Sequence, residues 1–152
     1  MIEAADDPDD APRDGEIVSP GPLTHDAALT FIGRIETPWT ARGDCPRRGD
    51  PQDGPLCRLV LDARWAPALD GLEPGAALQV LYWMHQARRD LVRLSPGLAT
   101  PRGPFALRAP TRPNPIASSR VTLVEREGAT LVVRGLDCLN GTPLLDIKPW
   151  RD

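Results

Sequence analysis

Proline is the feature of this sequence that most limits what it can fold into. The chain has 152 residues, of which 18 are proline and 13 are glycine, whereas average usage gives roughly 5% proline. A proline inside a helix removes a backbone hydrogen bond and costs about 3 kcal/mol. The prolines exclude a helical bundle and favour short strands joined by turns and loops.

Charge is distributed unevenly along the chain. Residues 1–26 hold eight acidic residues against one basic residue, Arg13, and almost no large apolar side chains. Such a segment cannot bury enough apolar surface to offset the entropy of ordering, so we expect a disordered acidic tail over residues 1–26. Residues 27–152 carry 17 basic and 13 acidic residues, a net charge of +4. We expect them to form one basic domain, although the whole chain carries −3.

Several classes of protein are excluded by what the sequence lacks. The first residues have no basic start followed by an apolar core, so they do not resemble a signal peptide. The longest nearly apolar run, residues 76–84, is too short to span a bilayer. The three cysteines are an odd number and form no C-x-x-C pair, which argues against a disulfide framework or a thiolate metal site. We therefore expect a soluble, cytoplasmic protein with free thiols and no metal.

Short segments of alternating apolar and polar residues predict an all-β fold. Turn residues separate these segments at short intervals, which favours a barrel or a sandwich over β-α-β units. Two of the segments flank Gly128-Ala129 and predict a hairpin. One-turn helical pieces are expected at residues 67–69 and 86–90. The predicted strands are residues 29–35, 57–61, 77–84, 103–108, 120–127, 130–136 and 144–147. Of these, residues 77–84 are apolar enough to predict burial on both faces, or one end under a partner chain.

Two long, proline-rich loops are too long to be simple connections. Residues 36–56 contain four prolines together with Arg42, Arg47 and Arg48, and residues 109–116 contain three prolines around Arg112 and Asn114. Loops of this length without secondary structure are typically binding loops or disordered. Proline restricts the free chain, so such a loop presents its side chains at a reduced entropic cost.

The common catalytic motifs are absent from this sequence. There is no phosphate-binding loop, no G-x-G-x-x-G, no H-E-x-x-H and no G-x-S-x-G. What remains is a polar loop, residues 137–143, after a predicted strand, and the guanidinium groups of Arg108 and Arg112, which suit carboxylates and phosphates. Taken singly, the polar loop can be a simple turn, and Arg108 and Arg112 can belong to a solvated basic face. Asp146 and Lys148 can likewise form an ion pair or be charges at the end of a strand.

Two long motifs, in order and well spaced, point to a known family. Residues 105–116 read FALRAPTRPNPI, similar to F-A-x-R-S-P-x-R-P-N-P-I, and residues 135–150 read GLDCLNGTPLLDIKPW, similar to L-D-x-x-D-G-T-P-x-x-D-I-K-P-Y. From Phe31 onward the chain resembles the TsaA-like family, the TrmO-type S-adenosylmethionine-dependent tRNA methyltransferases. Thr37-Pro38-Trp39 and the strand ending at His85 are also similar to family segments.

The resemblance implies a small, mostly antiparallel, single-sheeted β-barrel that forms a homodimer and holds S-adenosylmethionine near the subunit interface. It places Arg112 and Asn114 near the substrate or the interface. The cofactor positions that carry over by motif are Pro46, Arg47, Arg48, His85, Gln86, Arg108, the backbone around Ser118, Cys138, Leu139, Asn140 and Gly141.

The implied reaction is methylation of N6 of threonylcarbamoyladenosine at the anticodon-adjacent position 37 of tRNA. The acceptor nitrogen must lose a proton, and the candidate bases are Asp137, Asp146 and His85. A basic rim of arginines, residues 42, 47, 48, 108, 112 and 120, would suit a polyanion. Arg112 could instead grip the threonyl carboxylate.

Three departures from the family pattern leave other functions open. Ala117 stands where glycine is usual, Asn140 stands where aspartate is common, and the sequence ends at Asp152 without the further C-terminal domain of the tRNA-modifying members. An amide at 140 keeps an acceptor for a ribose contact but excludes a role as a base. The alternatives are a methyltransferase for a small molecule or a protein, or a module that binds S-adenosylmethionine without catalysis.

Overall fold

The structure, a computed structural model, describes residues 11–95 and 100–152. It is mainly β, and the chain divides into two compact units. The larger unit comprises Asp26–Gln86 and Ile116–Asp152, and the described residues of the smaller lie in Met1–His25 and Ala87–Pro115. In this division residues 87–115 group with residues of the amino-terminal segment. The expected boundary at residues 26–27 stays a prediction.

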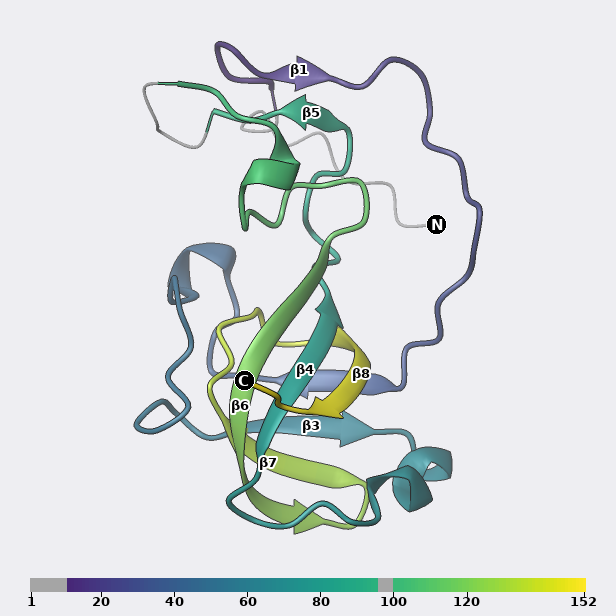
Figure 1. Cartoon of the computed structure of the whole chain (residues 1–152), viewed down its shortest axis with the longest axis vertical. Coiled ribbons are helices and arrows are strands. Elements are labelled where there is room, and N and C mark those ends of the chain that lie inside the picture. The colour runs from purple at the N-terminus through teal and green to yellow at the C-terminus, as the bar shows by residue number, and fades with distance from the viewer. Residues whose placement is uncertain (1–10, 96–99) are drawn as a thin grey trace. The chain divides into compact units, whose positions relative to one another are not determined.

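The larger unit is a closed barrel built from one sheet (Figure 1). Neighbouring strands are antiparallel throughout, in the order β2-β3-β7-β6-β4-β8, and β8 pairs with β2 to close the sheet. The expected all-β, single-sheeted barrel is confirmed. Its strands are β2 (Gly33–Glu36), β3 (Cys57–Leu61), β4 (Ala77–Trp83), β6 (Ile116–Glu127), β7 (Thr130–Arg134) and β8 (Thr142–Pro149).

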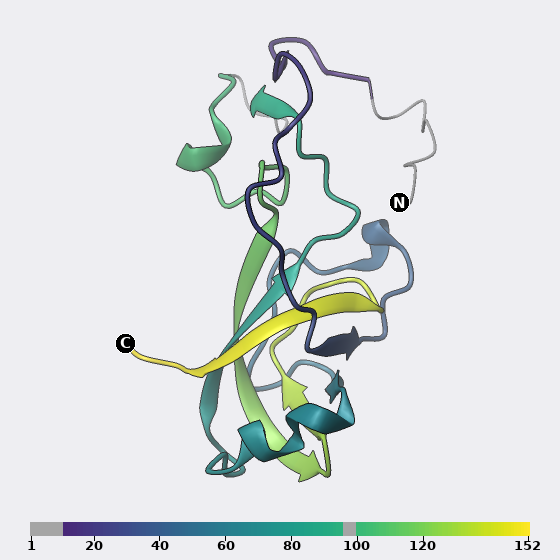
Figure 2. The same ribbon diagram turned by 90° about the vertical axis from the view of Figure 1, so that its right-hand side faces the viewer.

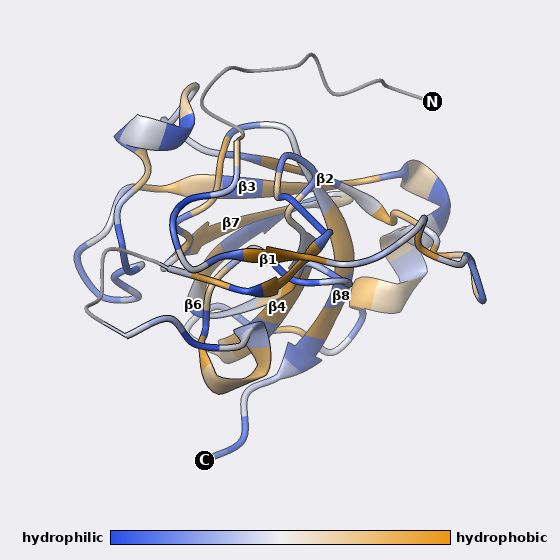
Figure 3. Cartoon of the chain, turned by 90° about the horizontal axis from the view of Figure 1, so that it is seen from above, coloured by the Kyte–Doolittle hydropathy of each residue, from blue (hydrophilic) through white to orange (hydrophobic). Residues whose placement is uncertain are grey.

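The barrel core follows from the alternation of side chains along the strands. Leu59 on β3, Val80 on β4 and Leu131 on β7 are fully buried, because every second residue of a strand points to the same face. Burial alternates along β4, so only one face of this strand is fully buried and the expected burial of both faces is wrong. In Figure 3 the barrel strands carry much of the hydrophobic colour.

One predicted strand and the predicted hairpin are confirmed, whereas other strands differ from their predicted bounds. Residues 57–61 form β3 with the expected bounds, and the hairpin of β6 and β7 turns at Gly128, whose φ of +64° suits glycine. The strand expected at residues 29–35 begins only at Gly33, and Phe31 is exposed outside it. Strand β8 exceeds the predicted residues 144–147 because it pairs with two neighbours, β2 and β4; it is the long yellow strand of Figure 2.

The smaller unit contains a two-stranded ribbon that the sequence did not predict. Strand β1 (Ile17–Val18) pairs antiparallel with β5 (Leu91–Arg93). Residues 17–18 lie in the segment expected to be disordered, so for these residues the expectation is wrong; residues 1–10 of that segment lie outside the described part. The strand expected at residues 103–108 is also wrong. A 3₁₀ turn, η4 (Pro104–Ala106), replaces it, because Pro104 cannot donate to a strand ladder and fits the start of a helical turn.

Two further 3₁₀ segments lie in the barrel unit, η2 (Arg42–Asp44) and η3 (Ala63–Leu69). The second includes the one-turn piece expected at residues 67–69. The piece expected at 86–90 is not helical, and the chain makes only a turn at His85 and Gln86. Across residues 11–95 and 100–152, the helical segments lack the length and apolar character needed to cross a membrane.

Candidate functional site

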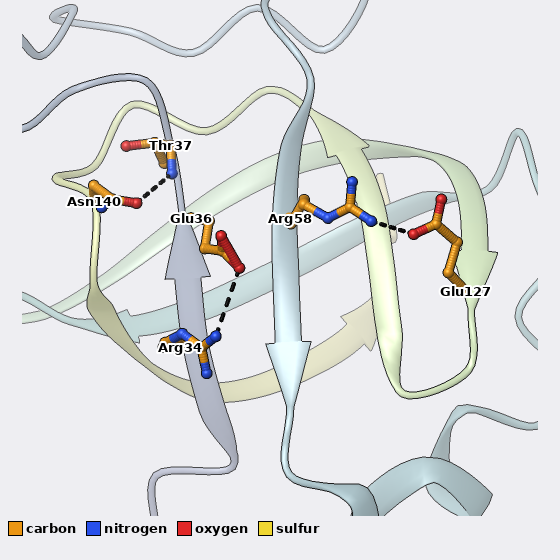
Figure 4. Close-up of polar contacts among 6 residues, drawn as sticks. All are labelled: Arg34, Glu36, Thr37, Arg58, Glu127 and Asn140. Carbon is orange, nitrogen blue, oxygen red and sulfur yellow. Dashed lines mark hydrogen bonds and ion pairs between the residues drawn. The ribbon is translucent and has the colours of Figure 1, made fainter.

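The loop at residues 138–141 is held against the turn that follows β2. The backbone N–H of Thr37 donates to Oδ1 of Asn140 at 3.0 Å, as Figure 4 shows, and the Thr37 hydroxyl donates to the carbonyl of Cys138 at 2.8 Å. The N–H of Asn140 in turn donates to the carbonyl of Trp39 at 2.7 Å. The loop is therefore fixed in shape by contacts more than 95 residues away in sequence, as a preformed binding loop must be.

Asn140 uses its acceptor within the protein. Its Oδ1 accepts the Thr37 N–H, which uses one of the two lone pairs of this oxygen. Among the described residues none accepts a hydrogen bond from the Asn140 side-chain nitrogen, and the residue is exposed. Asn140 is thus equipped to donate to a ligand from its amide group.

Asp137, the residue before this loop, takes part in a partly buried polar network. The hydroxyl of Tyr82 on β4 donates to Oδ1 of Asp137 at 2.9 Å, and the Tyr82 hydroxyl oxygen also lies 2.7 Å from Oγ of Ser119 on β6. Tyr82 is 2% exposed and burial raises its pKa strongly, with the charge of Asp137 adding to the shift. Burial also raises the pKa of Asp137, and the Tyr82 hydrogen bond offsets part of that rise.

The proline-rich loop over residues 36–56 is anchored beside this network by two glycines. A Cβ on Gly49 would meet the carbonyl oxygen of Gly135 at 1.8 Å, so the two backbones touch where only glycine fits. Arg134 adds a hydrogen bond of 2.6 Å to the carbonyl of Gly54. Burial, and then the charge of Asp137, raise the pKa of the Cys45 thiol. These contacts bring the segment before Gly49 towards Asp137.

The candidate cofactor residues of the barrel unit lie on its loops and turns, except for Ser118. Pro46, Arg47 and Arg48 are exposed on the anchored loop. His85 and Gln86 are exposed on the turn after β4, where the carbonyl of Gln86 accepts a 3.3 Å hydrogen bond from Arg42. This hydrogen bond joins the proline-rich loop over residues 36–56, the first loop, to the turn after β4.

Ser118 lies on β6, one residue before the inward-facing Ser119. Its hydroxyl is exposed and accepts a 3.0 Å hydrogen bond from Gln79. Because neighbouring residues of a strand point to opposite faces, the side chain of Ser118 points away from the Tyr82 network.

Arg108, Arg112 and Asn114 belong to the smaller unit. Arg112 donates to the carbonyls of Leu107, Ala109 and Pro104 at 3.2, 2.9 and 3.2 Å. Its guanidinium group organises its own loop, and a grip on a substrate carboxylate would require it to release these bonds. Arg108 and Asn114 are exposed.

Asp146 has a different environment from Asp137. Its carboxylate is half exposed and lies 3.0 Å from the ammonium group of Lys148, which confirms the ion pair considered from the sequence. Lys148 also lines a depression of about 410 Å³ on the barrel, together with Gln79, Pro149, Trp150 and Arg151. In the described ranges, no group of three or more His, Cys, Asp or Glu residues could hold a metal ion.

Tyr82 and Ser119 are residues that sequence reasoning did not select for the site. A signal was present, because Tyr82 follows Leu78 and Val80 at alternate positions of a strand and so points into the barrel. A buried tyrosine hydroxyl needs a polar partner. That requirement predicts a polar group inside the barrel, although it does not say which one.

These features define the class of the protein as a small, closed antiparallel β-barrel with a fixed polar loop after β7. The family model of the tRNA-methyltransferase O N-terminal domain matches residues 34–152. The chain belongs to this family, and the resemblance drawn from its motifs is confirmed.

Curated relatives and solved structures agree with the family. The chain is 51% identical over 140 residues to the "probable S-adenosyl-L-methionine-binding protein VirR" of Rhizobium radiobacter, covering 91% of this chain and 79% of that protein. It is 46% identical over 137 residues to the "putative S-adenosylmethionine-dependent methyltransferase RcsF" of Pseudomonas aeruginosa, covering 84% of this chain and 58% of that protein. A crystal structure of TrmO from Pseudomonas aeruginosa matches with a TM-score of 0.65 at 35% identity, covering 86% of this chain and 56% of that one. The chain thus spans little more than half of the TrmO chain.

Proposed function

We propose that the protein is an S-adenosylmethionine-dependent methyltransferase that methylates N6 of threonylcarbamoyladenosine at the anticodon-adjacent position 37 of tRNA. The observation that carries the proposal is the match of residues 34–152 to the tRNA-methyltransferase O domain. The names of VirR and RcsF support the cofactor and the reaction class. A tRNA substrate also fits a protein of the cytoplasm.

The residues of the barrel unit fit the chemistry of this cofactor. S-Adenosylmethionine, when bound, supplies an activated methyl group on a positively charged sulfur. We assign its binding to Pro46, Arg47, Arg48, His85 and Gln86, with the backbone around Ser118 and the loop Cys138, Leu139, Asn140 and Gly141. Arg108, which belongs to the smaller unit, stays a predicted cofactor residue. Arginine side chains suit a carboxylate, and the Asn140 amide can donate to a hydroxyl or ring nitrogen.

The protein's main contribution to such a transfer is alignment of the acceptor with the methyl group, because the leaving thioether is neutral. The acceptor nitrogen must also lose a proton. The carboxylate of Asp146 lies 3.0 Å from Lys148 and would have to leave that contact to reach a substrate, so Asp137 and His85 remain the better candidates. His85 is exposed on a turn, where a large substrate could reach it.

The arginines support a polyanionic partner. Arg47 and Arg48 are exposed on the anchored loop, and no described acidic residue forms an ion pair with either one. We assign them to contacts with tRNA phosphates or with the cofactor carboxylate. We assign Arg112 and Asn114 to the neighbourhood of the substrate or of the subunit interface.

We also propose that the protein acts as a homodimer. Four apolar side chains of the smaller unit support this, because Phe105 is 84% exposed and Ile17, Val18 and Val92 are each more than 40% exposed. Sedimentation velocity of the full chain tests the proposal, and a monomer at all concentrations would contradict it.

The test of the function is a methylation assay with the full chain, S-adenosylmethionine and two tRNA preparations. One carries threonylcarbamoyladenosine and the other is an unmodified transcript of the same sequence. We expect a single added methyl group on the modified adenosine, by nucleoside mass spectrometry, and none on the transcript. Methylation of neither tRNA would contradict the proposed substrate.

The name of VirR favours a second candidate, a module that binds S-adenosylmethionine without transferring its methyl group. This alternative predicts that the full chain binds S-adenosylmethionine by calorimetry but forms no S-adenosylhomocysteine with bulk tRNA, small-molecule extract or protein extract. Formation of S-adenosylhomocysteine with any of the three would exclude it, and the extract that supports turnover would name the substrate class.

A further inference from the structure

Within residues 11–95 and 100–152, no positively charged side chain pairs with the carboxylate of Asp137. It is half-buried, and among the described residues no arginine, lysine or histidine forms an ion pair with it. Its side-chain contact is the hydrogen bond from Tyr82, a neutral donor whose ring is inside the barrel. A partly buried charge without an opposite charge is costly, and such groups occur where a ligand supplies the missing charge.

The position of Asp137 also points towards a ligand. It lies directly before the loop 138–141, whose shape the Thr37–Trp39 turn fixes. Its negative charge acts on the Cys45 thiol, one residue before Pro46. Asp137 therefore directly precedes one segment that we assign to the cofactor, and Tyr82 on β4 donates a hydrogen bond to its carboxylate.

From this arrangement we propose that Asp137 recognises the positive charge on the sulfur of S-adenosylmethionine, so that the protein distinguishes the methyl donor from the neutral product S-adenosylhomocysteine. The inference rests on the proposed function, because it presumes that the cofactor binds at this loop. It adds a specificity residue to the cofactor positions that carry over from the family motifs. The same preference would help the product to leave after each transfer.

A sulfonium fits this environment better than the ammonium group of the cofactor does. An ammonium has three N–H donors and needs several acceptors. The nearby carbonyls of Cys138 and Leu139 already accept from the hydroxyls of Thr37 and Thr142, at 2.8 and 2.6 Å. A sulfonium carries its charge without N–H donors, so one carboxylate satisfies it without further acceptors.

The test uses the isosteric variant Asp137→Asn. The amide oxygen still accepts the Tyr82 hydrogen bond, so the variant removes the charge while keeping the network. Isothermal titration calorimetry of the full chain measures the affinities for S-adenosylmethionine and S-adenosylhomocysteine. We expect the variant to lose about tenfold or more in affinity for S-adenosylmethionine, the size of one partly screened charge pair, and less than about twofold for S-adenosylhomocysteine.

The matched control is Asp70→Asn, the same chemical change at a surface carboxylate that pairs with Arg126 at 3.3 Å. It is expected to leave both affinities unchanged. Circular dichroism and thermal unfolding check that each variant is folded. If Asp137→Asn does not fold, the wild-type protein decides alone: the proposal requires weaker binding of S-adenosylhomocysteine than of S-adenosylmethionine, and equal or tighter binding overturns it.

Each other outcome has a distinct meaning. An equal loss for both ligands would overturn the proposal, because it would mean that Asp137 meets the shared ammonium or shapes the loop. Unchanged affinities with loss of turnover would also overturn it and would identify Asp137 as the base. If the wild-type protein binds neither ligand, the proposed function itself fails, which distinguishes that failure from failure of the inference.

Discussion

The hydroxyl of Tyr82 donates a hydrogen bond of 2.9 Å to the carboxylate of Asp137 and so joins β4 to the polar loop after β7. The two residues are 55 positions apart in the sequence. This contact couples the inside of the barrel to the loop that we assign to the cofactor. Changes to either residue are therefore expected to affect both stability and ligand binding.

Removing this hydroxyl should destabilise the barrel. The variant Tyr82→Phe keeps the ring but leaves the Asp137 carboxylate and the Ser119 hydroxyl without their shared partner. We expect the free energy of unfolding to fall by about 1–3 kcal/mol, the usual cost of an unsatisfied buried polar group. Urea unfolding followed by circular dichroism measures the change. In the control Ser119→Ala, Tyr82 still donates to Asp137, so the loss should be smaller. Equal losses would show that the Asp137 contact contributes little.

The pH dependence of stability should show the raised pKa of Asp137. Burial raises this pKa in the folded state above the ordinary value of 3.8, so folding favours the protonated carboxyl group. Its stabilising contribution is fully present below pH 3.8 and is lost as the pH rises through the folded-state pKa. Relative to Asp137→Asn, the wild-type protein should therefore lose stability with rising pH in this window. A carboxyl pKa at or below 3.8, measured for Asp137 by carbon-13 NMR, would contradict the account.

The three thiols should differ sharply in reactivity. Cys45 is half-buried, whereas Cys57 and Cys138 are buried, and burial raises their pKa values to about 11 and about 12. With a thiol-specific reagent we expect Cys45 to react slowly in the native protein and the other two only after unfolding. Asp137→Asn should accelerate the reaction of Cys45, because the negative charge that raises its pKa is removed. An unchanged Cys45 rate would mean that Asp137 and Cys45 are not neighbours.

The glycine contact that anchors the first loop should not tolerate a side chain. In Gly49→Ala the new Cβ would overlap the carbonyl of Gly135, and we expect a loss of about 2 kcal/mol or more. Gly43→Ala, in the same loop, is the matched control, because nothing lies within 4 Å of its Cβ position. Thermal unfolding compares the two. Equal stability would show that the loop is not packed as described.

The hydrogen bonds of the Arg112 guanidinium group, rather than its positive charge, should keep its loop ordered. Arg112→Lys keeps the positive charge but cannot reproduce the fork that binds three carbonyls. We expect faster hydrogen exchange over residues 104–112 in this variant, with little change in the barrel. Arg93→Lys, at an exposed position of β5, is the control. Unaltered exchange in Arg112→Lys would leave the guanidinium group available for a substrate.

The barrel strands could be predicted from the sequence because each has a local pattern. Residues 57–61 alternate cleanly and became β3 without change. Strands β1 and β5 have only two and three residues, which is too short for an alternation to be recognised. The apolar residues around Pro104 resemble a strand in the sequence, but a proline at this position favours the 3₁₀ turn that the structure has.

The candidate site could be predicted only as far as its motifs reach. The motif containing Asp137 and Asn140 identified the loop, but the contacts of these residues with Tyr82 and Thr37 depend on strand pairing between distant segments. The three backbone hydrogen bonds of Arg112 could not be predicted for a similar reason, since a guanidinium group looks available in a sequence whether or not backbone carbonyls surround it.

The most direct test of the assigned site is a crystal structure of the full chain with S-adenosylmethionine. The account predicts density for the adenosyl group against the loop Cys138–Gly141, with the sulfonium sulfur beside the carboxylate of Asp137. Density for the ligand in the depression beside Gln79 and Trp150 instead, with none at Asp137, would contradict it.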